Sequence, residues 1–416
     1  MFDFLATIQD LGVPETLVYD LFLKHVFQAG SCTMRSIAGS LKLSVELVHG
    51  VFQRMKSQQL IEVKGMVGED YSFVLSQAGK NTAQERLHVS RYAGPVPVSL
   101  AQYENAVRAQ IARFPVNRKT LCEAYGDLTL GSELLDQLGP ALVSRSSMFL
   151  FGPSGTGKSS LAERLFRISH DSIAVPYAIE VDGNIVVLFD PSVHHRTDSA
   201  PPDSDDRWVF CARPCIIVGG ELVPGMLELQ RDPETGSYVA PMHMKANNGV
   251  FVIDDFGRQM ISPRDLLNRW IVPLDRRLDY LSMSNGVKFA IPFEVFVVFS
   301  TNLNPGELAD EAFLRRIPNK ILVDAILPRA FDEIVHRRLE SMGWAEEPQA
   351  AVHLRELCQE RGGDLRPCYP RDVFRIIESI ALFEEREPAL SNVDIDRASE
   401  LYFGPVSGEF RTGCAT

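Results

Sequence analysis

Residues 147–160 read Ser147-Met148-Phe149-Leu150-Phe151-Gly152-Pro153-Ser154-Gly155-Thr156-Gly157-Lys158-Ser159-Ser160. The apolar run at 148–151 predicts a buried strand, and the apolar spacing of 161–166 predicts a helix. Between them lies the pattern G-x-x-x-x-G-K-[ST], in the strand–loop–helix order that a phosphate-binding P-loop requires. The stretch therefore predicts a loop that wraps a nucleoside triphosphate. The alternative is a glycine-rich turn that matches the pattern by chance.

The loop predicts both of the expected cofactors, ATP and Mg²⁺. Its glycines let successive backbone N–H groups point at the phosphates, and the following helix adds its positive end. Lys158 is expected to reach the β- and γ-phosphates, and Ser159 to hold Mg²⁺ through its hydroxyl. The predicted cofactor-binding residues are Gly152, Pro153, Ser154, Gly155, Thr156, Gly157, Lys158, Ser159 and Ser160.

A second motif follows at residues 249–255, where an apolar run ends in two acids. This is the pattern of a buried parallel strand whose carboxyl end lies at a metal site. Asp254 is predicted to hold Mg²⁺, and Asp255 to orient or deprotonate the attacking water. An acidic pair that merely builds a turn is the alternative.

A third apolar strand is expected at 293–299, and it leads into Ser300-Thr301-Asn302. Asn302 suits a residue that contacts both a γ-phosphate and a water. It could instead build a turn together with Asn304-Pro305. Downstream, two arginine motifs stand out: Leu314-Arg315-Arg316 and Pro370-Arg371, the latter in the first turn of an expected helix.

The composition is that of a globular protein, with 416 residues, 45% hydrophobic, 23% charged and a net charge of −12. The acidic balance argues against general nucleic-acid binding, although a local basic face remains compatible with it. Seven scattered cysteines favour a reducing compartment over a disulfide framework. No apolar run approaches the ~20 residues that span a bilayer, and the N-terminus has no basic region typical of a signal peptide. We expect a cytoplasmic protein.

The N-terminal region predicts helices at 14–29, from Thr33 and from the N-cap Ser44, then strands at 60–63 and 71–75, and a helix from Gln77. This order resembles a winged helix-turn-helix domain over residues 10–90. In that family the helix at 44–60 enters the DNA major groove. Residues 1–90 carry 8 Lys/Arg and 9 Asp/Glu, so the basic footprint of a DNA reader is missing. Docking to DNA and docking to protein both stay open.

The P-loop, the strand ending in Asp254-Asp255, Ser-Thr-Asn, Leu-Arg-Arg and Pro-Arg, in this order, resemble an AAA+ ATPase over about residues 115–405. The resemblance implies an α/β fold, with a P-loop parallel sheet and a helical lid preceded by the small α+β winged-helix domain. It also implies that Asn302 is sensor 1, that Arg316 or its neighbour Arg315 is the arginine finger, and that Arg371 is sensor 2. The family usually has Glu where this chain has Asp255. Because Asp is shorter by one methylene, slow hydrolysis or an extra bridging water is expected.

Two expected hairpins narrow the branch of this family. Residues 226–240, and residues 278–293 with the turn Ser284-Asn285-Gly286, are similar to the helix-2 insert and the pre-sensor-1 hairpin of the MoxR-like and enhancer-binding branches. In those branches the hairpins face the ring pore and push on a protein or DNA partner. Plain edge hairpins are the alternative.

These features together predict a winged-helix domain at 1–92, a linker and lead-in helix at 93–130, the nucleotide-binding core at 131–328, and the helical lid and tail at 329–416. The lead-in helix is expected at 99–114, and residues 408–416 are expected to lack regular structure. The predicted function is Mg-dependent ATP hydrolysis by a homo-oligomeric ring, expected to be a hexamer, which remodels a protein or nucleic-acid partner. The alternative is an ATP-gated DNA-binding transcriptional regulator.

Overall fold

The computed structural model describes residues 2, 5, 7–68, 70–111, 116–202 and 204–404, without the side chains of Phe166 and Ala312. The expected irregular tail therefore lies outside the described residues, whereas the lead-in helix, predicted to reach residue 114, ends earlier, at Ala109. The chain divides into two compact units. The first comprises Met1–Arg113, Ser169–Val252 and Arg258–Val297, and the second comprises Phe114–Ile168, Ile253–Gly257 and Val298–Thr416.

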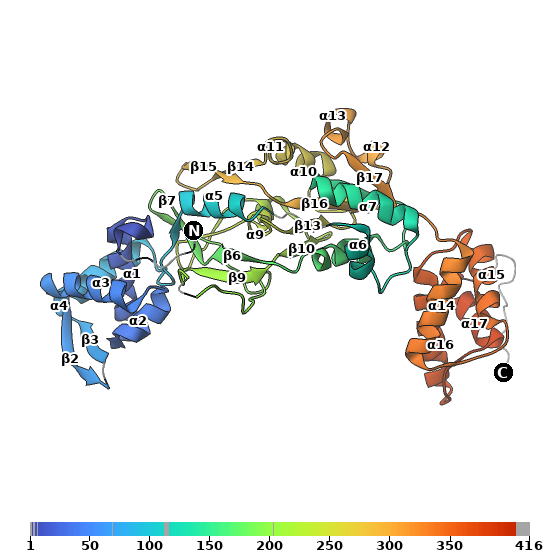
Figure 1. Cartoon of the computed structure of the whole chain (residues 1–416), viewed down its shortest axis with the longest axis horizontal. Coiled ribbons are helices and arrows are strands. Elements are labelled where there is room, and N and C mark those ends of the chain that lie inside the picture. Colours follow the sequence, from blue (N-terminus) through green and yellow to red (C-terminus); the bar gives the residue numbers. More distant parts are fainter. Residues whose placement is uncertain are drawn as a thin grey trace, which may run out of the picture. The chain divides into compact units, whose positions relative to one another are not determined.

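The first unit begins with three helices and a strand hairpin, in the predicted order (Figure 1). The elements are α1 (Glu15–Ala29), β1 (Cys32–Thr33), α2 (Met34–Leu41), α3 (Val45–Ser57), β2 (Ile61–Val67), β3 (Asp70–Leu75) and α4 (Gln77–Val89). Ser44 is the predicted N-cap of α3, and its hydroxyl accepts a hydrogen bond from the Leu47 N–H at 3.3 Å. The three strands form a small sheet in the order β1-β3-β2, with β2 at its edge.

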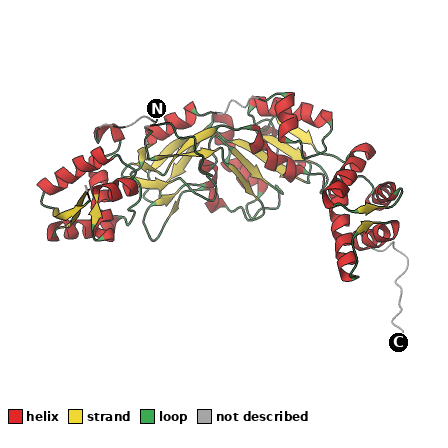
Figure 2. Ribbon diagram, turned by 60° about the horizontal axis from the view of Figure 1, so that its bottom comes forward, coloured by secondary structure: helices red, strands yellow, loops and turns green. Residues whose placement is uncertain are grey.

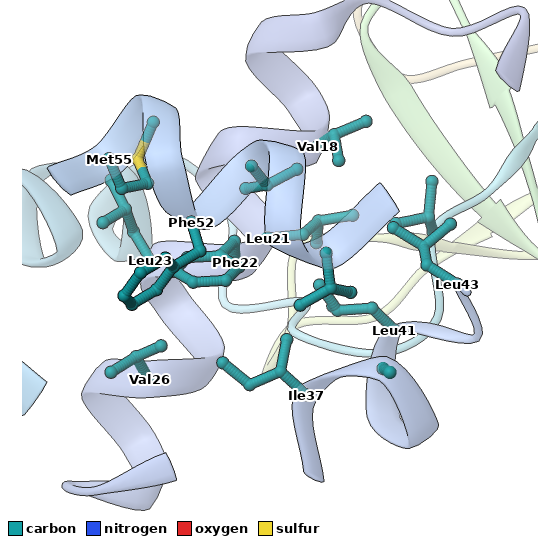
Figure 3. Packing of buried hydrophobic residues seen from close by; sticks show 14 of the residues in the cluster. Val18, Leu21, Phe22, Leu23, Val26, Ile37, Leu41, Leu43, Phe52 and Met55 are labelled. Carbon is teal, nitrogen blue, oxygen red and sulfur yellow. The ribbon is translucent and has the colours of Figure 1, made fainter. Parts of the chain in front are cut away.

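Apolar side chains from these helices converge on one core (Figure 3). Phe22 of α1 stacks on Phe73 of β3 with 5.9 Å between the ring centroids, and Phe52 of α3 meets the same ring edge-on at 5.0 Å. The helical spacing of Leu21, Phe22 and Val26 explains why one side of α1 is buried, since positions three and four apart share a face.

The rest of the first unit carries two larger β-structures. Its elements are β4 (Val98–Ser99), α5 (Leu100–Ala109), β6 (Ser172–Pro176), β7 (Ala178–Val181), β8 (Asn184–Val187), β9 (Trp208–Ala212), β11 (Gln230–Arg231), β12 (Tyr238–Val239), α9 (Met242–Lys245), α10 (Pro263–Arg269), α11 (Ile271–Arg276), β14 (Leu278–Ser282) and β15 (Lys288–Pro292). One sheet has the order β11-β12-β8-β7-β4, and β6 pairs with β9. Ser99 and Gln102 form a capping box at the start of α5, so the lead-in helix begins one residue later than predicted.

The hairpin predicted at 278–293 is present as the antiparallel pair β14–β15. The hairpin predicted at 226–240 is shorter than expected, because residues 224–227 form a 3-10 turn that begins at Pro224. Its strand β12 also pairs in parallel with β8, with Tyr238 opposite Val186. This hairpin is therefore the edge of a five-stranded sheet.

The P-loop strand lies inside a second five-stranded sheet, with the order β10-β13-β16-β5-β17. The strands are β10 (Cys215–Val218), β13 (Val250–Ile253), β16 (Phe296–Thr301), β5 (Met148–Phe151) and β17 (Asn319–Leu322). β5 pairs in parallel with both β16 and β17. Because strands distant in sequence are neighbours, the connections must cross over the sheet. The connection from β16 to β17 contains two short helices, Pro305–Leu308 and Glu311–Leu314. The predicted α/β fold with a P-loop strand inside a parallel sheet is confirmed by this strand arrangement.

The second unit holds the helices α6 (Arg118–Ala124), α7 (Ser132–Ser144), α8 (Lys158–Glu163), α12 (Pro305–Leu308) and α13 (Glu311–Leu314). It ends in a mainly helical segment (Figure 2) with α14 (Pro328–Met342), β18 (Ala345–Glu346), α15 (Ala350–Gly362), α16 (Cys368–Phe383), β19 (Ala389–Leu390) and α17 (Asn392–Phe403). These helices share an apolar core around Phe331, Leu354, Phe374 and Ile395. Within the described ranges, none of the helices has both the length and the apolar character to cross a membrane.

Candidate active site

The P-loop backbone depends on glycine at two positions for steric reasons. Gly152 has φ +141°, and a Cβ there would lie 2.3 Å from the Val323 carbonyl oxygen. Gly155 has φ +82°, and a Cβ there would lie 2.4 Å from the Cys368 sulfur. Both positions combine a backbone conformation that other residues avoid with a lack of room for any side chain. A cradle of this kind fits a phosphate chain, because the backbone N–H groups can approach it closely.

Lys158, the first residue of α8, is buried and points into the loop. Its ammonium donates three hydrogen bonds, to the carbonyls of Gly152 (2.9 Å) and Pro153 (2.7 Å) and to Oδ1 of Asn302 (2.6 Å). A phosphate oxygen can therefore take the place of one of these acceptors. Burial lowers the pKa of Lys158, and the Arg366 charge lowers it further, against the opposing effect of Asp254 and Asp255.

The two acids follow β13, whose residues are all buried. Asp254 is half-buried and accepts a hydrogen bond from the backbone N–H of Asp255 at 3.0 Å. Asp255 is exposed and has φ +50°, a left-handed conformation that Asp tolerates better than most residues. The loop is fixed to β16, since the Phe256 N–H donates to the Ser300 carbonyl at 2.7 Å.

Asn302, directly after β16, joins the lysine to the second acid. Its Oδ1 accepts from Lys158, and its Nδ2 lies 3.4 Å from Oδ1 of Asp255. The structure thus brings together three residues from three separate motifs. Ser159, the predicted metal ligand, follows Lys158 in the first turn of α8 and is exposed. The Ser159 hydroxyl and the Asp254 carboxylate are oxygen ligands of the kind that Mg²⁺ prefers, and Mg²⁺ retains several waters when bound.

Arg315 and Arg316 follow α13, which is capped by Asp310. Arg315 is exposed and Arg316 is half-buried, and the Arg316 carbonyl accepts a hydrogen bond from the Ser147 hydroxyl at 3.2 Å. They precede β17, the strand at one edge of the sheet. The contacts described for Lys158 do not include either arginine.

Arg371, the predicted phosphate sensor, lies in α16 with its side chain 68% exposed and pairs with Asp372 at 2.9 Å. A different arginine of the lid reaches the P-loop. Arg366 donates from Nη1 to the Ser154 carbonyl at 3.1 Å and pairs with Asp364 at 2.7 Å. None of the sequence motifs pointed to Arg366. The sequence does contain a hint of its role. Arg366 is followed by Pro367, shortly before the helix that carries Arg371.

A family model described as "Domain of unknown function (DUF8689)" matches residues 328–401, which hold the lid helices. No curated protein matches the chain. Among solved structures, a mutant of Thermotoga maritima RuvB is 14% identical and has a TM-score of 0.39, covering 65% of this chain and 70% of that one. The Thermotoga maritima RuvB Holliday junction branch migration motor is 13% identical with a TM-score of 0.37, covering 70% and 72%.

NtrX from Brucella abortus is 12% identical with a TM-score of 0.38, covering 76% of this chain and 59% of that chain. Identities and TM-scores this low do not bear on activity or partners. The strand order and the P-loop geometry show the fold by themselves.

Proposed function

We propose that this protein binds ATP with Mg²⁺ and hydrolyses it. The observation that carries the proposal is the contact of Lys158 with the P-loop carbonyls and with Asn302, which in turn reaches Asp255. A lysine ammonium held at a glycine-lined loop, with an amide and a carboxylate beside it, is an arrangement suited to phosphoryl transfer to water.

Each residue has a proposed role. Lys158 binds the phosphates, and Ser159 with Asp254 holds the metal ion, which neutralises phosphate charge when bound. Asp255 orients or deprotonates the attacking water, and Asn302 positions it. Asp255 is one methylene shorter than the usual Glu. We therefore expect slow hydrolysis, or an additional water between the carboxylate and the nucleophile.

Lys158→Ala tests this proposal. Phosphate release from ATP is measured with and without Mg²⁺ for the wild type, Lys158→Ala and the control Lys119→Ala, whose side chain is 85% exposed. We expect Mg-dependent hydrolysis by the wild type and the control, and none by Lys158→Ala. Wild-type hydrolysis by Lys158→Ala would refute the proposed role of the loop.

We propose further that activity requires assembly into a ring, with Arg316 or Arg315 completing the site of a neighbouring subunit and Arg371 sensing the phosphate in its own chain. An arginine finger is worth about 10³–10⁵ in rate in other P-loop enzymes. Arg316→Ala should bind ATP normally yet hydrolyse it poorly. Mixed with Lys158→Ala protein, it should regain part of the activity at shared interfaces. A rate per subunit that stays constant on dilution to monomer, with Arg316→Ala fully active, would contradict this.

We propose that ATP hydrolysis drives the remodelling of a protein partner in the cytoplasm. This partner is proposed to dock on the N-terminal winged-helix domain. The surface of this domain favours a protein partner over a DNA partner. Its hairpin exposes the apolar residues Val63, Met66, Val67 and Tyr71, and its Lys64 is already paired with Glu62 at 3.1 Å. Exposed apolar side chains are typical of protein interfaces, whereas phosphate backbones require unpaired cations.

The alternative, an ATP-gated DNA-binding regulator, is supported by the basic residues on and beside α3, which are Lys42, His49, Arg54 and Lys56. Binding of the full-length protein to duplex DNA, titrated over salt concentration, separates the two functions. Absence of binding at low salt would exclude the regulator, whereas tight binding with a steep salt dependence would favour it. The two hairpins are proposed to act on the partner, as in the MoxR-like branch.

A further inference from the structure

The segment that leads into α16 contacts the P-loop backbone at two consecutive residues. The Arg366 guanidinium donates to the Ser154 carbonyl at 3.1 Å, and the Cys368 backbone N–H donates to the Gly155 carbonyl at 3.3 Å. The Cys368 side chain occupies the space where a Cβ on Gly155 would lie. Since Ser154 and Gly155 stand in the middle of the loop, these contacts constrain the part of the backbone whose N–H groups are meant for phosphates.

The Arg366 guanidinium is held in one orientation by its neighbours. Nε and Nη2 form two parallel hydrogen bonds with the Asp364 carboxylate, at 2.7 and 3.0 Å. The guanidinium carbon also lies 5.8 Å from the centre of the Tyr369 ring, whose hydroxyl donates to the same carboxylate at 3.3 Å. A paired and stacked guanidinium loses little further freedom when it binds, so its remaining donor Nη1 is preorganised toward the loop.

Arg366 and Lys158 place two positive charges at the same loop. Arg366 donates to the Ser154 carbonyl, and Lys158 donates to the carbonyls of Gly152 and Pro153. Two cations near one loop repel each other, and a polyphosphate relieves this repulsion by placing negative charge between them. The relief grows with the charge of the ligand, so it favours a triphosphate over a diphosphate.

We propose that Arg366 is a positioning residue of the nucleotide site: it fixes the P-loop backbone through the Ser154 carbonyl and adds a positive charge that favours ATP over ADP. This inference rests on the proposed ATP binding. It is distinct from the role expected for Arg371, which pairs with Asp372 and is mostly exposed. The lid therefore contacts the P-loop through Arg366, independently of any contact that Arg371 makes.

The test measures dissociation constants of MgATP and MgADP for the full-length protein by calorimetry, together with KM and kcat for ATP. The variants are Arg366→Gln, Arg366→Lys and Asp364→Asn, and the control is Arg375→Gln, an exposed arginine of α16. We expect Arg366→Gln to raise the Kd of MgATP about tenfold and that of MgADP about threefold, since a charged hydrogen bond contributes at about this level. KM should rise with it and kcat should change little.

Arg366→Lys separates charge from geometry. It keeps the charge but cannot pair with Asp364 and reach Ser154 together, so the preference for ATP should return while both affinities stay about threefold weaker. Asp364→Asn should weaken both nucleotides similarly, since it loosens Arg366 without removing its charge.

Two results would overturn the inference. If wild-type protein binds MgATP and Arg366→Gln binds it equally well, Arg366 has no role at the site and the proposed ATP binding stands. If Arg366→Gln weakens MgATP and MgADP by the same factor, the claim of discrimination fails. Absence of MgATP binding by the wild type itself would instead refute the proposed function, and the inference with it.

Discussion

The Lys158 cluster and the Asp279 cluster each join a cationic side chain and a carboxylate through hydrogen bonds, but their carboxylates differ in exposure. The Lys158 cluster, of Lys158, Asn302 and Asp255, ends at an exposed carboxylate. The Asp279 cluster joins His243, Asp279, Arg269 and Glu228 in the first unit, and both His243 and Asp279 are buried. The two clusters therefore differ in how accessible their carboxylates are to a ligand.

The side chains of the Asp279 cluster form their hydrogen bonds mostly with one another. Oδ2 of Asp279 is 2.7 Å from Nε2 of His243 and 2.9 Å from Nη2 of Arg269. Arg269 uses its Nε on Glu228 at 2.6 Å. Asp279 lies in β14, His243 in α9, and Glu228 just before β11, so the cluster ties both hairpin bases to α10. A buried carboxylate with this many donors has little capacity left for a ligand.

The Lys158 cluster is open to a ligand in two respects. The Asp255 carboxylate is exposed, and Lys158 holds acceptors that a phosphate can replace. We expect burial, more than residue type, to distinguish a polar cluster that only stabilises the fold from one that can bind a ligand. Four predictions test this view.

Asp279→Asn should have the largest effect on stability. It removes the buried charge that Arg269 and His243 face, and breaking a buried ion pair costs about 3–5 kcal/mol. The free energy of unfolding from urea titration measures the loss. Asp255→Asn serves as the comparison, because it changes an exposed carboxylate. Equal stability of the two variants would mean that burial does not distinguish the clusters.

Asp255→Asn should reduce the rate of hydrolysis by about 10²-fold or more, since general-base catalysis contributes about 10²–10⁴. Asn tolerates the left-handed backbone at this position, so the loop should keep its conformation. Binding of ATP should persist, and the change in stability should stay within about 0.5 kcal/mol. The rate is measured as phosphate release, and ATP binding by calorimetry. Unchanged turnover would remove Asp255 from the proposed chemistry.

Asn302→Asp should weaken ATP binding by about tenfold, a smaller effect. The new carboxylate would pair with the Lys158 ammonium and compete with the phosphates for it, and one charged hydrogen bond is worth about 1.5–3 kcal/mol. Asn302→Ala provides the control, as it removes the acceptor without adding charge. Tighter ATP binding by Asn302→Asp than by Asn302→Ala would contradict the expected competition.

The smallest effect is on the pH dependence of stability. Burial alone would raise the pKa of Asp279, but the hydrogen bonds from His243 and Arg269 outweigh it and hold that pKa below the ordinary carboxyl value. A carboxyl whose pKa is lower in the folded state stabilises the fold above its unfolded pKa, and this contribution is lost as the pH falls through the folded pKa. Urea titrations below about pH 5 should therefore show a steeper loss for the wild type than for Asp279→Asn. Parallel curves would exclude Asp279 as the titrating group.

Local features of the chain were predictable because consecutive residues set them. The P-loop follows from glycines that accept positive φ, and the start of α3 follows from the side chain of Ser44. The buried strand before Asp254 follows from its uninterrupted apolar residues. The hairpin at 226–240 was only partly predicted, because its strand β12 is held by a parallel pairing with β8 that no local pattern encodes.

The sequence by itself determined the P-loop, the order of the elements and the residues available for phosphate chemistry, since backbone conformation and apolar periodicity are local properties. Only the tertiary structure decided which distant side chains meet. Lys158 contacts Asn302 across 144 positions, and Arg366 reaches Ser154 across 212. The tertiary structure also decided that Asp279 is buried and that Asp255 is exposed. Such contacts arise when packed cores bring segments together, and packing depends on the whole chain rather than on neighbouring residues.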